Sequence, residues 1–210
     1  MKNKTALKNL IIVLFLLVFL TVLYISGYQT KDSRVLENSQ RENTAFQEAF
    51  GNIEVRAQSA FAFDLSNGKV FFAKNQNEKL PIASLSKIMT ALVVLDKLDK
   101  ESIIIIPAEA LKTTGDDGLK PDEGWRVEDL VKFMLLVSSN DAATAFSVRY
   151  PGDLVADMNT KASELGFSNT FFFNEHGLDV KVEENSKEYK TGNYGSAKEV
   201  AYLLSYVASR

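Results

Sequence analysis

The sequence offers serine and lysine side chains for chemistry and excludes several other kinds of site. The chain of 210 residues has no cysteine and a single histidine. Cysteine nucleophiles, thiolate metal sites and metal sites built from several histidines are therefore excluded. We expect no metal ion and no cofactor, so any chemistry must use Ser, Thr, Lys, Tyr, Asn or carboxylate groups.

The most informative pattern is Ser-x-x-Lys, because two residues three apart on a helix share a face. Ser84 and Lys87 form such a pair at the start of an apolar helix that we predict for residues 82–98. The amino terminus of a helix favours a developing oxyanion, and Lys87 enters an apolar interior where a lysine can act as a base. The alternative is that Ser84 only caps the helix and Lys87 extends its charged end to solvent. A second copy, from Ser66 to Lys69, lies in a predicted hairpin turn and is interpreted as turn chemistry.

A second polar group follows another predicted helix. Ser138 and Asn140 form a Ser-x-Asn pattern directly after an apolar stretch at residues 127–137. In one interpretation these residues only cap the junction between two helices. Combined with Ser84 and Lys87, however, they supply a hydroxyl for proton relay and an amide that can hold a substrate carbonyl and the lysine. The four residues together indicate an acyl-transfer site.

The elements that must position these residues give an α+β pattern. Two strand-like runs flank an Asn-Gly turn, which is a strong hairpin signal, and helical periodicity dominates the rest of the chain. A Ser-x-x-Glu capping box predicts that a last helix opens at Ser196. Strands followed by a run of helices indicate an α+β domain. The predicted strands are residues 57–64, 69–73, 103–106 and 171–173, and the helices before Ser196 are residues 82–98, 127–137 and 154–165.

The amino-terminal region predicts a membrane tether. Residues 10–25 carry no charge, and Lys2, Lys4 and Lys8 precede them, so we expect the amino terminus to stay in the cytoplasm and the rest to be exported. A cleaved signal peptide is the alternative, although the small-x-small cleavage pattern is poor here. We therefore expect a single-pass protein of the cell (inner) membrane, with its domain facing the periplasm or the extracellular side.

This interpretation divides the chain into four parts. Residues 1–8 form a cytoplasmic tail, residues 9–27 a transmembrane signal anchor, residues 28–56 a spacer and residues 57–210 the folded domain. Three of the 24 basic residues precede the anchor, which leaves 21 against 27 acidic residues. This acidic balance disfavours a nucleic acid as a partner.

The polar patterns also carry a resemblance to a known family. Residues 81–90 (PIASLSKIMT) resemble the active-serine segment of the serine D-Ala-D-Ala carboxypeptidases, the low-molecular-mass penicillin-binding proteins. Further segments resemble that family in the same order, so that the likeness extends over residues 57–210. They are residues 63–70, 124–130 (GWRVEDL), 138–143 (SSNDAA), 158–159, 165–166, 177–179 and 193–199 (NYGSAKE).

The resemblance implies a fold, an activity and residue roles. The implied fold is the penicillin-binding-protein/β-lactamase-like transpeptidase fold, and the implied substrate is the pentapeptide stem of peptidoglycan, from which the terminal D-alanine is removed. By the same resemblance, β-lactam antibiotics are inhibitors. Ser84 is the acylated nucleophile, Lys87 the general base, Ser138 a relay group and Asn140 a substrate-binding and positioning group; the identity of the base is disputed in related enzymes.

One departure from the family pattern leaves other functions open. The family's third motif, Lys-Thr-Gly, follows the segment that resembles residues 193–199, whereas Lys190-Thr191-Gly192 precedes it in a stretch, residues 183–192, that we predict to be a loop. We interpret this copy as coincidental and expect a partial domain that lacks the last part of the sheet. A catalytically inert, anchored penicillin-binding-like module is therefore an alternative. A β-lactamase-related hydrolase is another, although no Glu-x-x-x-Asn follows the Ser-x-Asn pattern.

For His176 we expect a local hydrogen bond rather than a catalytic role.

Overall fold

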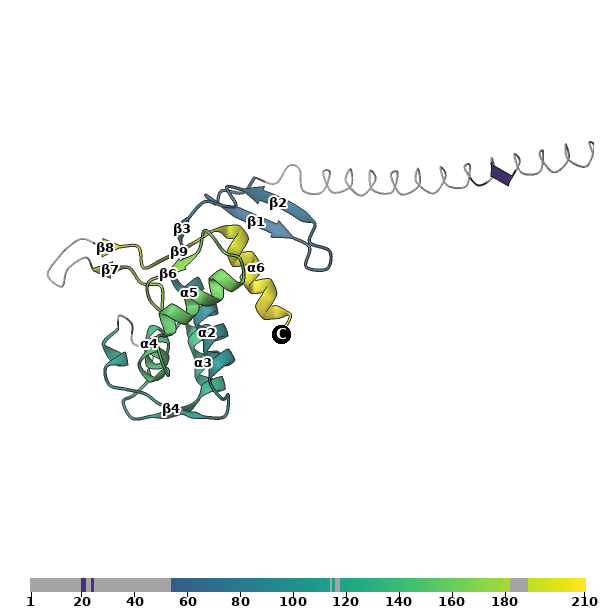
Figure 1. Cartoon of the computed structure of the whole chain (residues 1–210). Helices are drawn as coiled ribbons and strands as arrows, with labels where there is room; N and C mark the ends of the chain where they lie inside the picture. The colour runs from purple at the N-terminus through teal and green to yellow at the C-terminus, as the bar shows by residue number, and fades with distance from the viewer. Residues whose placement is uncertain (1–19, 22–23, 25–53, 114, 116–117, 182–188) are drawn as a thin grey trace, which may run out of the picture. The chain divides into compact units, whose positions relative to one another are not determined.

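The computed structural model describes residues 20, 21, 24, 54–113, 115, 118–181 and 189–210 (Figure 1). The chain divides into two compact units, Met1–Val55 and Arg56–Arg210. The predicted tail, anchor and spacer lie outside the described residues, apart from three helical positions, residues 20, 21 and 24, and residues 54–56. Within the described ranges, no helix is both long and apolar enough to cross a membrane.

The second unit begins with the predicted hairpin. Strands β1 (Ala60–Phe63) and β2 (Val70–Lys74) pair antiparallel. The connecting turn includes Gly68 at φ +74°, a conformation that glycine adopts without steric cost. Helix α6 (Ala197–Ala208) packs against this hairpin, with the ring of Tyr202 edge-on to that of Phe63 at 5.0 Å. The hairpin prediction is thus confirmed.

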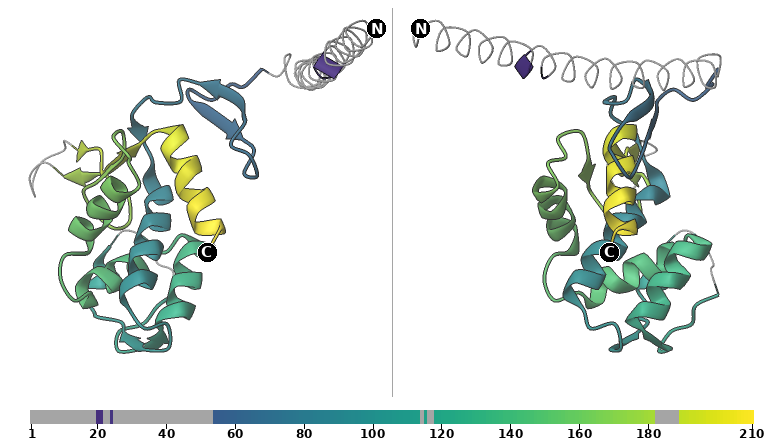
Figure 2. Two further views of the ribbon diagram at one scale, coloured as in Figure 1. Left: turned by 45° about the vertical axis from the view of Figure 1, so that its right-hand side comes forward. Right: turned by 90° about the vertical axis from the view of Figure 1, so that its right-hand side faces the viewer.

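Helix α2 (Ser86–Lys97) forms the centre of the unit. It packs against α3 (Val127–Val137), α4 (Asn140–Arg149), α5 (Leu154–Glu164) and α6, and Figure 2 shows α5 and α6 on either side of it. Because α2 has neighbours on several sides, its sequence is apolar around most of its circumference. The core that results consists of fully buried side chains, among them Met89, Val94, Leu130, Met134, Phe146 and Met158.

Short antiparallel sheets complete the α+β architecture. One sheet has the strand order β3-β9-β6, formed by Leu80–Pro81, Asn193–Gly195 and Phe171–Phe172. A second pairs β4 (Ile103–Ile105) with β5 (Gly124–Arg126), and a third pairs β7 (Val180–Lys181) with β8 (Tyr189–Lys190). Of the two 3-10 turns, η1 (Ala83–Leu85) precedes α2, and η2 (Ala110–Lys112) lies between β4 and β5. The three-stranded sheet matters most, because it leads into the candidate site from two directions.

Three predictions from the sequence differ from the structure: where α2 begins, the loop at residues 183–192, and the burial of residues 171–173. The helix predicted for residues 82–98 begins only at Ser86, because Ala83 adopts φ +44° and a separate 3-10 turn precedes α2. The stretch predicted as a loop contains β8, which pairs with β7. In the run predicted as a core strand, only Phe172 is buried, whereas Phe171 and Phe173 are exposed, because successive side chains of a strand point to opposite faces.

The predicted capping box at the last helix is half correct. The hydroxyl of Ser196 accepts a hydrogen bond from the Glu199 amide at 3.3 Å and caps α6. The Glu199 carboxylate accepts instead from the amides of Ser168 and Asn169 and from the Thr170 hydroxyl. Glu199 thereby connects α6 to the segment that leads into β6.

Candidate active site

Ser84 lies at an exposed bend between β3 and α2. The residue before it, Ala83, has the left-handed φ of +44°, and the Ala83 carbonyl accepts a hydrogen bond from the hydroxyl of Ser86 at 2.7 Å. Left-handed backbone at a residue other than glycine costs about 1–3 kcal/mol, and such conformations gather at functional sites. The alternative that Ser84 caps α2 is wrong, since Leu85 occupies the N-cap position and no side chain caps that end.

Lys87 lies in the first turn of α2 with its side chain turned inward. The side chain is 1% exposed, so it does not extend to solvent. Its amine donates to the Ser84 hydroxyl oxygen at 3.0 Å, to Asn140 Oδ1 at 2.8 Å and to the backbone carbonyl of His176 at 3.1 Å. A buried amine needs such partners, because an unsatisfied buried polar group is costly. The structure thus brings together the serine and lysine predicted from their spacing.

The junction between α3 and α4 supplies the second predicted pair. Ser138 ends α3 in the left-handed conformation, at φ +59°. This turn reverses the chain so that Asn140, the first residue of α4, directs its amide oxygen at Lys87. The capping serine is the one between them: Ser139 Oγ accepts from the Ala142 amide at 2.9 Å. The interpretation that both residues only cap the junction is therefore wrong for Asn140, whereas Ser138 is the C-cap residue of α3.

A pocket of about 410 Å³ lies between Ser84 and Ser138, and Asn140 is not among the residues that line it. Ser84, Lys87 and Ser138 line it together with apolar side chains of α2 and α3 and of the segment before α2. An exposed hydroxyl, a buried amine and a second hydroxyl thus face one partly apolar pocket. The apolar members are Ile82, Ala83, Leu85, Ile88, Met134 and Leu135.

The loop at residues 174–178 contributes a carbonyl that the sequence did not predict. Gly177 has φ +88°, and a Cβ atom there would lie 1.9 Å from the Ala83 carbonyl oxygen. The loop therefore packs directly on the backbone before Ser84, and the His176 carbonyl reaches Lys87. No residue type signals this contact, because a backbone oxygen makes it.

The His176 side chain makes the local hydrogen bond that we expected. Its Nδ1 accepts from the Leu178 amide at 3.0 Å. Burial lowers the pKa of His176 below its ordinary value, Glu175 acts in the opposite direction, and the nearby charge of Lys87 lowers it further. The imidazole therefore stays neutral at neutral pH.

The Lys190-Thr191-Gly192 copy serves a structural junction. Lys190 ends β8, and Gly192 packs so closely that a Cβ atom there would lie 1.8 Å from the Leu178 carbonyl oxygen. The Gly192 amide donates to Asp179 Oδ1 at 3.1 Å. These three residues are not among those that line the pocket at Ser84.

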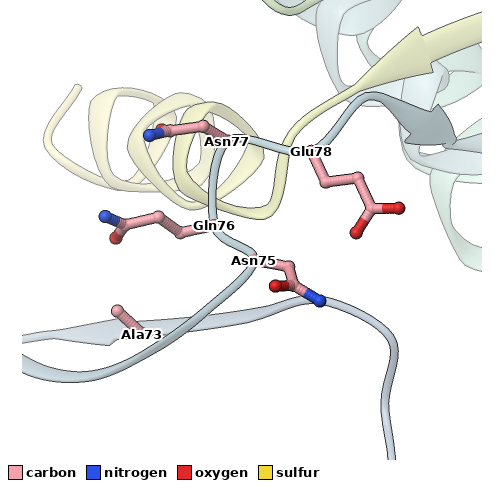
Figure 3. Close-up of a pocket in the computed structure, with 5 residues that line it drawn as sticks. All are labelled: Ala73, Asn75, Gln76, Asn77 and Glu78. Atoms are coloured by element: carbon pink, nitrogen blue, oxygen red, sulfur yellow. The ribbon is translucent and has the colours of Figure 1, made fainter.

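A second pocket, of about 500 Å³, lies on the loop after β2 (Figure 3). Gln76 and Asn77 point to one side of this loop, and Asn75 and Glu78 point to the other. Asn75 donates to the Gln58 carbonyl at 2.9 Å, and Glu78 accepts from the Gln58 side chain at 2.6 Å. These bonds tie the loop to the residues before β1, and the described side chains do not converge on one point.

Comparisons with known proteins identify the family to which this chain is similar. A protein-family model described as D-alanyl-D-alanine carboxypeptidase matches residues 42–210. The D-alanyl-D-alanine carboxypeptidase DacF of Bacillus subtilis is 36% identical over 156 residues, which cover 70% of this chain and 38% of that protein. A D-alanyl-D-alanine endopeptidase of Pseudomonas aeruginosa is 32% identical over 75% of this chain and 48% of its own length. The chain thus spans about two fifths to one half of the length of these relatives.

Solved structures show the same fold. The crystal structure of a D-alanyl-D-alanine carboxypeptidase from Mycobacterium tuberculosis superposes with a TM-score of 0.67 at 28% identity, over 75% of this chain and 58% of that one. Penicillin-binding protein D2 from Listeria monocytogenes, in its ampicillin-bound form, has a TM-score of 0.62 at 30% identity, over 75% of this chain and 64% of that one. The helical region with antiparallel sheets is therefore the fold of penicillin-binding proteins, as the motifs predicted.

Proposed function

This chain belongs to the family of D-alanyl-D-alanine carboxypeptidases, and on that premise we propose that it removes the terminal D-alanine from peptidoglycan stem peptides through an acyl-serine intermediate. One observation carries the proposal. The buried amine of Lys87 touches both Ser84 Oγ and Asn140 Oδ1. An exposed serine with an amine in hydrogen-bond reach, oriented by a third group, is the arrangement of an activated nucleophile.

In the proposed acylation, Ser84 is the nucleophile and Lys87 the base. When the Lys87 amine is neutral it keeps two N–H donors, for Asn140 Oδ1 and the His176 carbonyl, and its lone pair accepts the hydrogen bond from the Ser84 hydroxyl. It takes this proton as Ser84 Oγ forms a bond to the carbonyl carbon of the substrate. The Ser84 amide stabilises the oxyanion, as the backbone at a helix amino terminus can. The bond to the D-alanine nitrogen then breaks, and the proton held by Lys87 passes through the Ser138 hydroxyl to the leaving amine.

Hydrolysis of the acyl-enzyme completes the proposed cycle. A water molecule attacks the ester carbon and gives one proton to the Lys87 amine. The bond from that carbon to Ser84 Oγ breaks, and the proton returns to Ser84. Throughout both steps Asn140 holds the Lys87 amine and a substrate carbonyl, so that the amine stays aligned with Ser84 as its charge changes.

β-Lactam antibiotics are the proposed inhibitors, because they acylate the same serine. Support comes from the Listeria relative, whose structures carry ampicillin and cefotaxime. The test is covalent labelling of the full chain by a fluorescent penicillin, read on a denaturing gel. We expect labelling that Ser84→Ala abolishes and that Ser66→Ala, in the other Ser-x-x-Lys copy, leaves unchanged. A folded full chain that does not label contradicts the proposal.

A second assay, the release of D-alanine, distinguishes an enzyme that turns over its substrate from a module that only binds it. Incubation with a peptidoglycan pentapeptide should release D-alanine from the unmodified chain and not from Ser84→Ala. Labelling by penicillin without release would favour the inert, penicillin-binding-like module instead.

We further propose that the domain is exported and tethered to the cell membrane. The uncharged stretch at residues 10–25 and the three lysines before it support this placement. Expression of the full chain in bacteria should place it in the membrane fraction, with the domain degraded by protease added outside the membrane. Recovery in the cytosolic fraction would contradict the tether.

A further inference from the structure

Strand β9 lies between the two segments that hold Lys87. In the three-stranded sheet β3 pairs with one edge of β9 and β6 with the other. Strand β3 leads into the turn that carries Ser84, and β6 leads into the loop whose His176 carbonyl accepts from Lys87. The first residue of β9, Asn193, is 1% exposed and is not among the residues that line the pocket. Asn193 therefore lies where both segments leave the sheet.

On the side of β3, Asn193 holds the backbone before Ser84. Its Nδ2 donates to Ser86 Oγ at 2.7 Å, and Ser86 Oγ donates in turn to the Ala83 carbonyl at 2.7 Å. The Asn193 carbonyl also accepts from the Ile82 amide at 3.3 Å. The left-handed conformation of Ala83 is unfavourable by itself, so it persists only because such bonds fix the backbone around it.

On the side of β6, the same carboxamide holds the loop at residues 174–178. Asn193 Oδ1 accepts from the amides of Phe173 and Asn174 at 2.7 and 3.1 Å, and Nδ2 donates to the Asn174 carbonyl at 2.9 Å. The Asn174 side chain then accepts from the Gly177 amide at 2.6 Å and donates to the Leu178 carbonyl at 2.8 Å. These bonds shape the loop that presents the His176 carbonyl to Lys87.

We infer that Asn193 is a positioning residue for acyl transfer. It holds the turn that carries Ser84 and the loop that carries the His176 carbonyl, the acceptor for Lys87, in a fixed position relative to each other. The inference rests on the proposed function. The carboxamide uses two donors and two acceptor positions, which is the full capacity of an asparagine side chain. Its loss should therefore shift Ser84 relative to Lys87, and a shift of about 1 Å can slow a reaction by about 100-fold.

Asn159 provides a matched control, because its side chain makes the same kind of bonds to α5 and β6, and none of these bonds reaches the turn of Ser84 or the loop at residues 174–178. Asn159 Nδ2 donates to the Val155 and Phe172 carbonyls at 3.0 and 2.8 Å, and Oδ1 accepts from the Phe172 amide at 2.9 Å. Truncation of either asparagine removes bonds between a carboxamide and backbone. Only Asn193, however, connects to the turn of Ser84.

The experiment compares acylation rates for Asn193→Ala and Asn159→Ala in the full chain. Single-turnover labelling over a series of fluorescent penicillin concentrations gives a maximum rate and a half-saturating concentration, both corrected for the folded fraction. We expect Asn193→Ala to lower the maximum rate by about 10- to 100-fold, with the half-saturating concentration nearly unchanged. Asn159→Ala should lower stability and keep the maximum rate. Ser86→Ala, which cuts only the link to the turn, should also lower the rate.

Two results would overturn the inference. One is an unchanged maximum rate in both Asn193→Ala and Ser86→Ala, and the other is an equal loss of rate in Asn159→Ala. If the unmodified chain does not label at all, the proposed function fails by itself. Positioning is then read from the NMR signal of the 13C-labelled Lys87 side chain, which must move in Asn193→Ala and not in Asn159→Ala. An unmoved signal contradicts the positioning role.

Discussion

The amine of Lys87 lies 2.8 Å from Oδ1 of Asn140, although 53 residues separate the two in the sequence. Helix α2 carries the lysine and α4 begins with the asparagine, and both helices pack into one core. The contact fixes the direction of the amine, which a lysine with four rotatable bonds does not fix by itself. It joins two motifs into one site.

Replacement of this acceptor by a carboxylate should slow acylation and change its pH dependence. In Asn140→Asp the acceptor oxygen remains, but its negative charge favours the ammonium form of Lys87. A base must be neutral to accept a proton, so we expect labelling by penicillin to slow by about tenfold or more at neutral pH. The rate should rise at higher pH than in the unmodified chain. Equal pH profiles of the two labelling rates would contradict this role of Asn140.

Substitutions of the adjacent Ser138 and Ser139 should have different effects, one on the acylation rate and the other on stability. Ser139→Ala removes the cap of α4 and should lower the free energy of unfolding by about 0.5–2 kcal/mol, measured by urea titration. Ser138→Ala removes a hydroxyl that lines the pocket, so it should change stability by less than about 0.5 kcal/mol and slow acylation by about 100-fold. The reverse assignment of the two effects would show that Ser138 is not the relay.

Gly177→Ala should destabilise the protein more than the same change at another left-handed glycine. At Gly177 a Cβ atom meets the Ala83 carbonyl, whereas at Gly166, with φ +75°, nothing lies within 4 Å. The left-handed conformation alone costs about 1–2 kcal/mol, which is the loss expected for Gly166→Ala. Overpacking adds about 1–3 kcal/mol at Gly177. Urea unfolding of both variants checks the difference, and equal losses would mean that the loop moves away freely.

His176 should make the protein less stable as the pH falls below about 6.5. Burial holds the pKa of His176 below its ordinary value of 6.5, so below that pH the unfolded chain binds a proton that the folded chain does not. Stability is therefore lost as the pH falls from 6.5 towards the folded pKa. His176→Asn keeps an acceptor for the Leu178 amide and removes the titration. Urea unfolding from pH 7.5 to 5.5 should show a smaller loss in this variant, and parallel losses would contradict the prediction.

The spacing of residues in the sequence was enough to identify Ser84 and Lys87 as a pair. It did not predict the backbone conformation around Ser84. Ser84 and Lys87 meet because the 3-10 turn η1 runs directly into α2, so that residues three apart still lie on one side. The hairpin, α3 and α5 follow from periodicity and turn residues. The exposed bend at Ser84 was not predicted. It depends on the left-handed Ala83, which the packing of Gly177 and the hydroxyl of Ser86 hold in place, and no feature of an alanine signals that conformation.

What the sequence by itself determined is the set of groups available for chemistry, since without cysteine and with one histidine these are hydroxyls, lysine, amides and carboxylates. Spacing then selected Ser84, Lys87, Ser138 and Asn140 among them. What only the tertiary structure decided is which distant groups complete the site. The Asn140 amide, the His176 carbonyl and the Asn193 carboxamide reach the start of α2 across 53, 89 and 107 residues. Contacts over such separations exist only after the helices and the small sheet have packed. They depend on how the apolar faces fit together, and a pattern of neighbouring residues does not encode that fit.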